Sequence, residues 1–454
     1  MRASLYGRRG ANGWQSSRRA ISSAASRAYT QALAHYLTDV FDVTVFDLDQ
    51  YLLRGRHPRV RALGDRHIKQ ICRALAGFDV VNLQLEYGTL GGTAKDICRR
   101  FSWLADAAPR LSVTFHTLKR PPIFPLVDFI KRILTLKWRS AGDIHAEFSR
   151  NRKLSLTIPG RLRRAQRRKP VSVIVHNRRD LSDARHLHGF DRVYDHPLAF
   201  LPADRVESAR AQASRHRFPS IEALSPGFTL IGVFGFLNYY KGFGTAVRAL
   251  HHLPESHHLL IFGGVHPNEI PAHQPVHSYL ASLLEDVQVD AARIDRTSSA
   301  GADRDISAKL AGSQPRDLSS RVHFMGAPDD TDFLAGMAIC DVVVLPYLEV
   351  GQSSSGPISL AVELGSRIIA SRTHTFLEFA AYHPNTIEFF DIGNHLELAE
   401  RIAARAQYAT RREPARYNVE TNKAVYLAAN SPPASPAVGF LRRRNSPQPI
   451  RAER

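Results

Sequence analysis

Two short segments in the second half of the chain have residues suited to binding phosphate. Gly235 to Gly242 joins a strand pattern to a helix pattern, with Lys241 at the entrance of that helix. The free amides of a helix N-terminus and the charge of a neighbouring lysine both attract anions. The segment Ser353 to Gly356 precedes Pro357, a residue suited to the first helical turn, and offers a second set of amides. Two such sites at neighbouring strand ends indicate a phosphate ligand, such as a diphosphate.

Polar side chains follow three apolar runs in the first half of the chain. Glu86, His116 and the pair His176-Asn177 each come directly after such a run. Open parallel sheets bind their ligands at the carboxyl ends of the strands. A single histidine after a strand is commonly a loop or capping residue, so it is the coincidence of three polar strand ends that predicts a cleft lined by these side chains.

Strand-length apolar runs alternate with helix-length amphipathic runs through both halves of the chain. This alternation is typical of a parallel sheet covered by helices. A length of 454 residues exceeds one ordinary domain and fits two. We therefore predict an α/β protein with two Rossmann-like parallel-sheet domains that face each other across a cleft.

The chain is strongly basic, with 61 Lys and Arg against 42 Asp and Glu and a formal net charge of +19. The segment 131–169 alone holds 13 basic and two acidic residues, interleaved with apolar ones. We interpret it either as a solvated helix face or as an amphipathic surface for anionic lipid headgroups. Charge alone also suggests nucleic acid. No helix-turn-helix, zinc-finger or RNA-recognition signature is present, so we expect no nucleic-acid partner.

Other patterns exclude several classes of protein. No apolar run approaches the roughly 18 residues that cross a bilayer. The three scattered cysteines form neither a disulfide framework nor a zinc cluster, and no Gly-x4-Gly-Lys-Ser/Thr phosphate loop occurs. The first residues lack the apolar core of a secretory signal, and their arginine and serine content fits a transit peptide only weakly, because arginine is abundant throughout. We expect a cytoplasmic protein, either free or peripheral on the inner face of the plasma membrane.

Five segments of the second half together carry a family resemblance. They are 235–242, 321–326, 341–347, 353–357 and 363–371. In order and spacing they resemble the donor domain of nucleotide-sugar glycosyltransferases with the two-Rossmann-domain (GT-B) fold, and the retaining family 4 group in particular. The first half is similar to the partner domain of that fold through the segments 79–92, 113–117 and 173–177, and 417–426 resembles its last helix.

The resemblance implies transfer of a sugar from a nucleotide diphosphate donor to a glycan or lipid-linked acceptor. It also implies retention of configuration, no metal and no cofactor besides the sugar nucleotide as co-substrate. The implied organisation is an acceptor-side domain at 1–205, a donor domain at 227–405 and a helix that crosses back at 406–430. Composition predicts the other segments: a linker at 206–226, which is polar and contains prolines, an insertion at about 287–320, which is rich in Ala, Ser, Asp, Arg and Gly, and a disordered tail at 431–454, which has five prolines and no periodicity.

The resemblance also assigns site residues. The donor would be held by Gly235, Lys241, Tyr347, Gln352, Ser353, Ser354, Ser355, Gly356 and Glu363. The acceptor side would comprise Gly13, Glu86, His116, His176 and Asn177. Catalysis would fall to His116, Lys241 and Glu363, with Lys241 stabilising charge on the leaving diphosphate. That leaving phosphate could itself take the proton of the acceptor.

The sequence departs from the family at three positions. Gln352 and Leu360 occupy the places of the usual Glu-x7-Glu motif, and Phe236 stands where the family commonly has an arginine. Glu349 or Glu363 could substitute for the missing carboxylates. These departures keep open a second interpretation, a catalytically reduced glycosyltransferase-like binding or scaffold subunit, and a sugar-nucleotide epimerase on the same fold is a further alternative.

Overall fold

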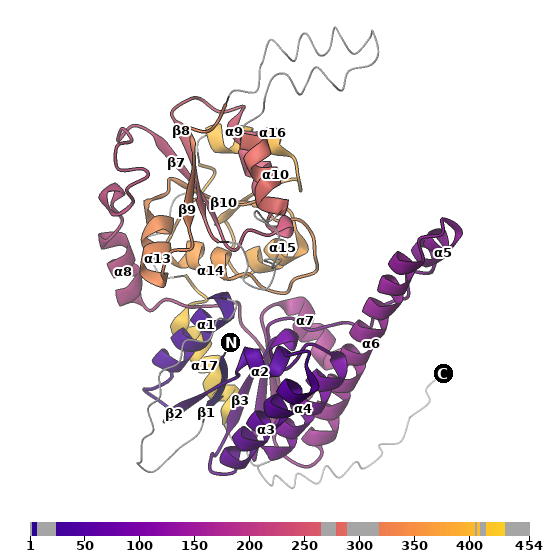
Figure 1. Cartoon of the computed structure of the whole chain (residues 1–454). Coiled ribbons are helices and arrows are strands. Elements are labelled where there is room, and N and C mark those ends of the chain that lie inside the picture. The colour runs from indigo at the N-terminus through magenta and orange to yellow at the C-terminus, as the bar shows by residue number, and fades with distance from the viewer. Residues whose placement is uncertain are drawn as a thin grey trace, which may run out of the picture.

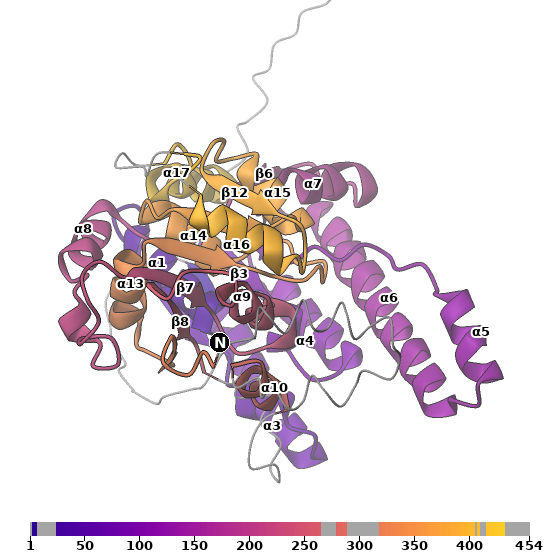
Figure 2. The same cartoon turned by 90° about the horizontal axis from the view of Figure 1, so that it is seen from above.

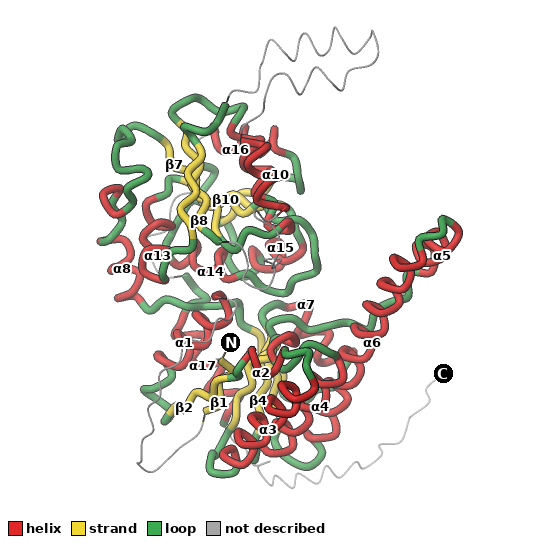
Figure 3. The backbone as a smooth tube through the Cα atoms, viewed as in Figure 1, coloured by secondary structure: helices red, strands yellow, loops and turns green. Residues whose placement is uncertain are grey.

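The structure is a computed structural model that describes residues 2–6, 24–264, 278–287, 317–404, 406–408 and 415–431. Within these residues the chain forms two α/β domains, one above the other in Figures 1 and 3. Each domain has a central parallel sheet with helices on its faces. The predicted fold class is therefore confirmed.

The first domain is built around a parallel sheet in the order β3-β4-β5-β6. Strands β1 and β2 form a separate two-stranded antiparallel sheet that lies beside β3. This pair departs from the parallel arrangement expected for the whole domain, because alternation of strands and helices does not fix the direction of an edge strand. The strands are β1 (Arg2–Tyr6), β2 (Val43–Asp47), β3 (Val81–Leu85), β4 (Leu111–Phe115), β5 (Val171–Val175) and β6 (Val193–Asp195).

The helices of this domain lie on both faces of the sheet. They are α1 (Ala24–Tyr36), α2 (Gln50–Arg54), α3 (Pro58–Leu75), α4 (Ala94–Ala107), α5 (Leu126–Leu134), α6 (Trp138–Gln166) and α7 (Arg178–Ser182), joined by the C-terminal helix α17 (Val419–Asn430). In Figure 1 the yellow α17 lies beside the indigo α1, at the first domain rather than the second. The last described helix therefore returns to the domain in which the chain began.

The two faces of the first sheet differ in chemistry because residues alternate between them along each strand. One face is apolar and packs against α3, α4 and α6. The other face holds buried polar side chains, and α1 and α17 cover it. Gln84 donates to the hydroxyl of Tyr426 at 3.0 Å, and that hydroxyl also bonds Thr114 at 2.9 Å. Since a buried polar group is costly unless it is hydrogen-bonded, these bonds fix how α17 docks on the sheet.

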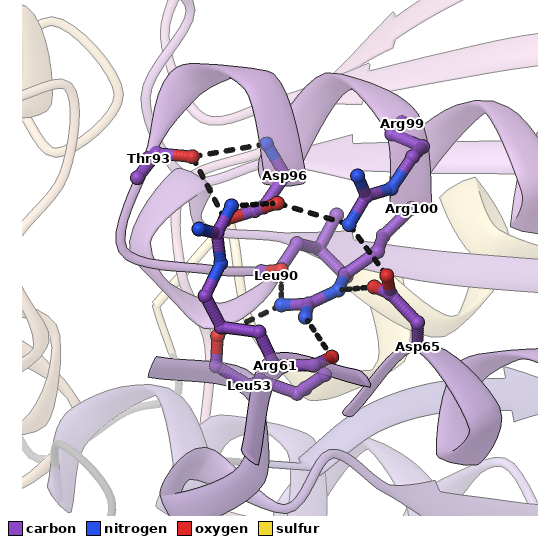
Figure 4. Close-up of polar contacts among 8 residues, drawn as sticks. All are labelled: Leu53, Arg61, Asp65, Leu90, Thr93, Asp96, Arg99 and Arg100. Carbon is purple, nitrogen blue, oxygen red and sulfur yellow. Dashed lines mark hydrogen bonds and ion pairs between the residues drawn. The ribbon is translucent and has the colours of Figure 1, made fainter. Parts of the chain in front are cut away.

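A fully buried arginine, Arg100, connects the helices that cover the apolar face of the first sheet (Figure 4). The guanidinium of Arg100 on α4 donates to Asp65 of α3 at 2.8 Å. It also donates to the carbonyls of Leu53 at 2.8 Å and Leu90 at 2.9 Å, which lie at the end of α2 and in the loop after β3. One side chain thus ties four segments together, including the loop that carries Glu86.

The second domain has a six-stranded parallel sheet in the order β12-β11-β10-β7-β8-β9. Its strands are β7 (Thr229–Phe234), β8 (His257–Phe262), β9 (Val322–Gly326), β10 (Val342–Leu345), β11 (Ile368–Ser371) and β12 (Ile387–Phe390). Both faces are apolar and buried, as expected for a sheet covered on two sides. Its helices are α8 (Ala203–Ala211), α9 (Phe243–Leu250), α10 (Ser278–Val287), α13 (Asp330–Ile339), α14 (Gly356–Glu363), α15 (His374–Ala380) and α16 (His395–Ala403).

The segment expected to be a linker, 206–226, has more structure than its prolines suggest. It includes most of α8, and Ala209, Phe218 and Ile221 belong to the core of the second domain. The chain therefore enters that core before β7, because a few apolar side chains in a polar stretch suffice to anchor it. Most of the expected insertion and of the expected tail lies outside the described residues.

Candidate functional site

A cavity of about 360 Å³ lies between the two domains and is lined by both of them. The first domain contributes Tyr29, Glu86 and His116 among others, and the second contributes the loop before α9 and the start of α14. The carboxyl ends of β3, β4, β7 and β10 lead into these segments, as expected for ligand sites of open parallel sheets.

Eight of the predicted site residues line this cavity: Glu86, His116, Gly235, Lys241, Gln352, Ser354, Ser355 and Gly356. Five others lie outside the lining and have structural contacts described below: Tyr347, Ser353, Glu363, His176 and Asn177. Gly13 lies outside the described residues.

Lys241 is the buried cation of the cavity. Its Nζ donates to the hydroxyl of Tyr347 at 2.5 Å and lies 3.8 Å from the centre of that ring. Desolvation lowers the pKa of Lys241 to about 7. Ser355 also donates to the Tyr347 hydroxyl, at 3.3 Å, so Tyr347 positions both groups from beneath the cavity. An anion near Nζ would favour the charged ammonium and reverse the desolvation penalty.

Two close backbone contacts of the loop that carries Lys241 require glycine, one at Gly242 and one at Gly263 in the neighbouring segment. Gly242 has φ +64°, and a Cβ there would lie 1.8 Å from the carbonyl oxygen of Pro346. Gly263, at the end of β8, approaches the carbonyl oxygen of Gly235 so closely that a Cβ would lie 1.7 Å from it. The backbones of neighbouring strand ends therefore pack against each other, and this holds the Lys241 loop against the segment before α14.

The start of α14 faces the cavity with Gly356 and Pro357, and its first amides lack helical partners. Two hydrogen bonds join this segment to the first domain. Ser354 donates to the carbonyl of His116 at 3.3 Å, and Asn177 donates to the carbonyl of Ser353 at 3.0 Å. Asn177 thus bridges the domains, a role that its position after a strand did not indicate.

His116 is buried and neutral at the mouth of the first domain. Its Nε2 lies 3.0 Å from Oε1 of Gln84, and its ring contacts those of His176 and Tyr29. Burial, with a smaller contribution from His176, lowers the pKa of His116 to about 3. Burial likewise lowers the pKa of His176 to about 4, and its Nδ1 bonds the carbonyl of His196 at 3.0 Å.

Glu363 and Glu349, the two candidates to replace the missing motif carboxylates, do not line the cavity. Glu363 accepts from the backbone amides of Phe200 at 2.8 Å and Leu201 at 3.3 Å, where the chain leaves the first domain. Burial raises its pKa to about 8. Glu349 is exposed and accepts from the amide of His374, at the start of α15, at 2.8 Å. Both carboxylates have structural partners in these positions.

The departures from the family pattern all lie at the cavity wall. Gln352, Leu360 and Phe236 line it. Leu360 packs against the cores of both domains and so presents a hydrocarbon wall, where the glycosyltransferases that the sequence resembles have a carboxylate. Phe236 leaves Lys241 as the one basic residue in the described lining.

Sequence reasoning missed Tyr29 and Gln84. Tyr29 lines the cavity and comes from α1, a helix rather than a strand end. Gln84 was visible as a polar residue within an apolar strand, a pattern that signals a buried hydrogen-bond network.

The described residues contain no group of three or more His, Cys, Asp or Glu side chains placed to hold a metal ion. Among the helices that can be described, none has both the length and the apolar character to cross a membrane.

Comparison with known proteins gives likenesses of fold. No family model matches the sequence, and no curated protein matches it. The chain is similar to HepE of Anabaena in complex with UDP-glucose, with 15% identity over 82% of this chain and 82% of that chain and a TM-score of 0.43. It is also similar to a glycosyltransferase from Rickettsia africae, with 12% identity over 83% and 79% of the two chains and a TM-score of 0.46. A UDP-forming α,α-trehalose-phosphate synthase from Burkholderia vietnamiensis is similar over 89% of this chain and 77% of that chain, with 13% identity and a TM-score of 0.48.

Proposed function

We propose that the chain is a glycosyltransferase that binds a nucleotide diphosphate sugar in the cavity between its domains. The observation that carries this proposal is the convergence of Lys241 and the N-terminus of α14 on one cavity. A lysine and a set of free helix amides form a complementary site for a diphosphate. The sequence resemblance to retaining family 4 glycosyltransferases supports the same function.

Transfer would develop negative charge on the diphosphate as the bond to the sugar breaks. Donors that are already in place, such as the Lys241 ammonium and the amides at Ser355 and Gly356, stabilise that charge without reorganisation. The leaving phosphate would accept the proton of the attacking hydroxyl, so that the reaction needs no protein nucleophile. His116, neutral at physiological pH, would hydrogen-bond a sugar or acceptor hydroxyl.

The finer features of the reaction are also proposals. We propose retention of configuration without a metal, and an acceptor that is a glycan or is linked to lipid. The acceptor would enter on the side of the first domain, beside Glu86 and His116, which line the cavity there. A peripheral location on the inner face of the plasma membrane would bring the site to lipid-linked acceptors.

A second candidate is a glycosyltransferase-like subunit that binds a ligand without transferring sugar. The hydrocarbon wall formed by Leu360 and the single cation at the diphosphate site favour it. The two candidates differ in the fate of a bound donor, which one function consumes and the other leaves intact.

A thermal-shift screen of common nucleotide sugars tests the proposal, because a ligand that binds only the folded state raises the melting temperature. We expect one donor to raise it, and Lys241→Ala to abolish the shift while Lys153→Ala, on the exposed surface of α6, leaves it intact. Mass spectrometry of the donor incubated with candidate acceptors then separates enzyme from binding subunit. A shift without release of the nucleoside diphosphate would favour the subunit, and no shift with any donor would refute both.

A further inference from the structure

A helical hairpin extends from the first domain away from the rest of the described chain. It consists of the loop 120–125, α5, the turn at Thr135 and Leu136, and the first half of α6 (Figures 1 and 2). None of the residues of α5 is buried. The second half of α6 is different, because Leu154, Ile158 and Leu162 pack in the core of the first domain. The C-terminal half of α6 therefore packs in the first domain, and its N-terminal half forms part of a projecting arm.

Within the arm, apolar side chains of the loop, α5 and α6 pack against one another on the inner face. The ring of Phe124 packs against Phe129 of α5 and Phe148 of α6, at centroid distances of 5.2 Å and 4.9 Å. The hairpin thus has its own small contact surface, which uses part of its apolar residues.

The outer face of the arm is apolar too and has no partner in the described chain. Val127, Ile130 and Leu134 lie at i, i+3 and i+7 and form one stripe along α5. The exposed set comprises Ile123 (93%), Leu126 (57%), Val127 (80%), Ile130 (45%), Leu134 (77%), Leu136 (73%) and Trp138 (61%). Scattered exposed leucines are normal, but a contiguous apolar patch on a projecting element marks an interaction site.

The turn at the tip strengthens this interpretation. Leu136 has φ +55°, a left-handed conformation that a glycine or asparagine adopts more easily than leucine does. A large apolar side chain therefore occupies a position that is unfavourable both for its backbone conformation and for its exposure to water.

The charge around the patch is complementary to an anionic surface. Between residues 123 and 139 the chain has four basic residues, Lys131, Arg132, Lys137 and Arg139, and one acid, Asp128. An amphipathic helix with basic residues beside a Trp- and Leu-rich face is suited to the boundary between lipid headgroups and acyl chains. Patches that bind a second protein more commonly have a core depleted of charged residues.

We propose that the tip of this arm, residues 123–138, inserts into the headgroup region of an anionic membrane. The contact is the apolar tip, assisted by its basic residues, rather than the whole basic run 131–169. The later part of that run is used within the domain, where Arg161 donates to Ser102 at 3.0 Å and Lys169 donates to the carbonyls of Ala105 and Ala108. This membrane contact does not depend on the proposed glycosyl transfer.

The place where the arm begins connects it with the cavity. His116 and Thr117, which line the cavity, follow β4, and the arm starts a few residues later. If the proposed function holds, an acceptor anchored in the membrane would approach the cavity from its first-domain side.

Co-sedimentation of the full chain with lipid vesicles tests the proposal. We expect binding to vesicles of phosphatidylcholine mixed with phosphatidylglycerol, and weaker binding to phosphatidylcholine alone. High salt should weaken the binding but not abolish it, because apolar insertion adds to charge attraction. The fluorescence of exposed Trp138 should shift to the blue with vesicles, and Trp138→Phe should remove that shift.

The decisive variant is Val127→Ser/Ile130→Ser/Leu134→Ser, which changes exposed side chains and should leave the melting temperature unchanged. We expect at least roughly tenfold weaker vesicle binding. The matched control is Leu156→Ser/Leu377→Ser/Leu396→Ser, three exposed leucines away from the tip, which should bind as the wild type does. Equal binding by the tip variant and the control would overturn the proposal. A dimer in solution that the tip variant alone disrupts, without vesicle binding by the wild type, would instead assign the patch to a second copy of the chain.

Discussion

Nε2 of His116 donates its hydrogen to Oε1 of Gln84 across 3.0 Å. The direction follows from the other bonds of Gln84, whose amide nitrogen donates to Asn82 at 2.7 Å and to Tyr426 at 3.0 Å, so that its oxygen must accept. A neutral imidazole has one N–H, so Nδ1 of His116 is the acceptor atom. The buried network under α17 therefore sets the tautomer of a cavity histidine.

Two replacements of Gln84 should affect His116 differently, one through its pKa and the other through the orientation of its ring. Gln84→Glu should raise the pKa of His116 above about 3, because a carboxylate favours the imidazolium. Gln84→Leu should lower the rate of transfer by about tenfold with little change in donor KM, since it frees the ring without touching the diphosphate site. Histidine NMR titration and steady-state kinetics measure the two effects. Thr114→Val, which removes a network member that does not bond His116, is the control, and an equal loss of rate in that variant would contradict the positioning role.

Donor affinity should fall as pH rises above neutrality. Lys241 has a pKa of about 7 in the free protein, so below that pH it is charged and above it the ammonium must be formed on binding. Proton linkage gives a loss of up to about tenfold in affinity per pH unit above 7. Calorimetry from pH 6 to about 9 measures it. Glu363 also titrates near pH 8, so Glu363→Gln is the control and should keep the same slope. A flat profile would show that Lys241 does not contact the bound anion.

Gly242→Ala should disrupt the loop that carries Lys241. The new Cβ would lie 1.8 Å from the carbonyl oxygen of Pro346, in addition to the strain of φ +64°, so the loop must move away from β10. We expect a loss of more than about 2 kcal/mol in unfolding free energy, or loss of donor binding in a folded variant. Gly351→Ala is matched, because φ is +71° but no atom lies within 4 Å of the new Cβ. It should cost about 1 kcal/mol, which chemical denaturation can resolve.

Glu363→Gln should stabilise the protein increasingly as pH rises from 5 to 8. The folded state raises the pKa of Glu363 to about 8 from an ordinary value of 4.5, so it binds the proton more tightly than the unfolded chain does. The wild type therefore loses stability over this window, whereas glutamine does not titrate. We expect the variant's advantage to grow by an amount on the order of 1–3 kcal/mol, measured by denaturation at several pH values. A constant difference would mean that the carboxylate is solvated.

Arg100→Leu should destabilise the first domain strongly. It removes a buried guanidinium that donates to three carbonyls, and it leaves Arg99 as the partner of Asp65, a change that costs about 3–5 kcal/mol. Arg372→Ala breaks an exposed ion pair with Asp391 and should cost less than about 1 kcal/mol. Urea denaturation of both variants checks the contrast, and similar losses in the two would contradict the assigned role of burial.

The segments of the second domain that line the cavity could be predicted from the sequence because they are local. Gly235, Lys241 and Ser354 to Gly356 lie in short strand-to-helix connections, where residue order largely determines which groups face the end of the sheet. The alternation of apolar runs likewise gave both parallel sheets.

The place of His116 in the cavity lining could be predicted from its position after a strand, but the bonds that orient its ring could not, because their partners are distant in sequence. Gln84 and Tyr426 are 342 residues apart and meet only because α17 returns to the first domain. Glu363 was misplaced for a related reason. It lies one turn beyond Leu360 on α14, yet its carboxylate is held by the amides of Phe200 and Leu201, which spacing within the helix does not reveal.

Calorimetric titration with the nucleoside diphosphate of the donor that the thermal-shift screen selects tests the central claim most directly, because it isolates the diphosphate site from the acceptor. We predict one binding site per chain in the wild type and in Lys153→Ala, and at least about tenfold weaker binding in Lys241→Ala. Equal affinity in the wild type and Lys241→Ala would contradict a diphosphate site at this cavity.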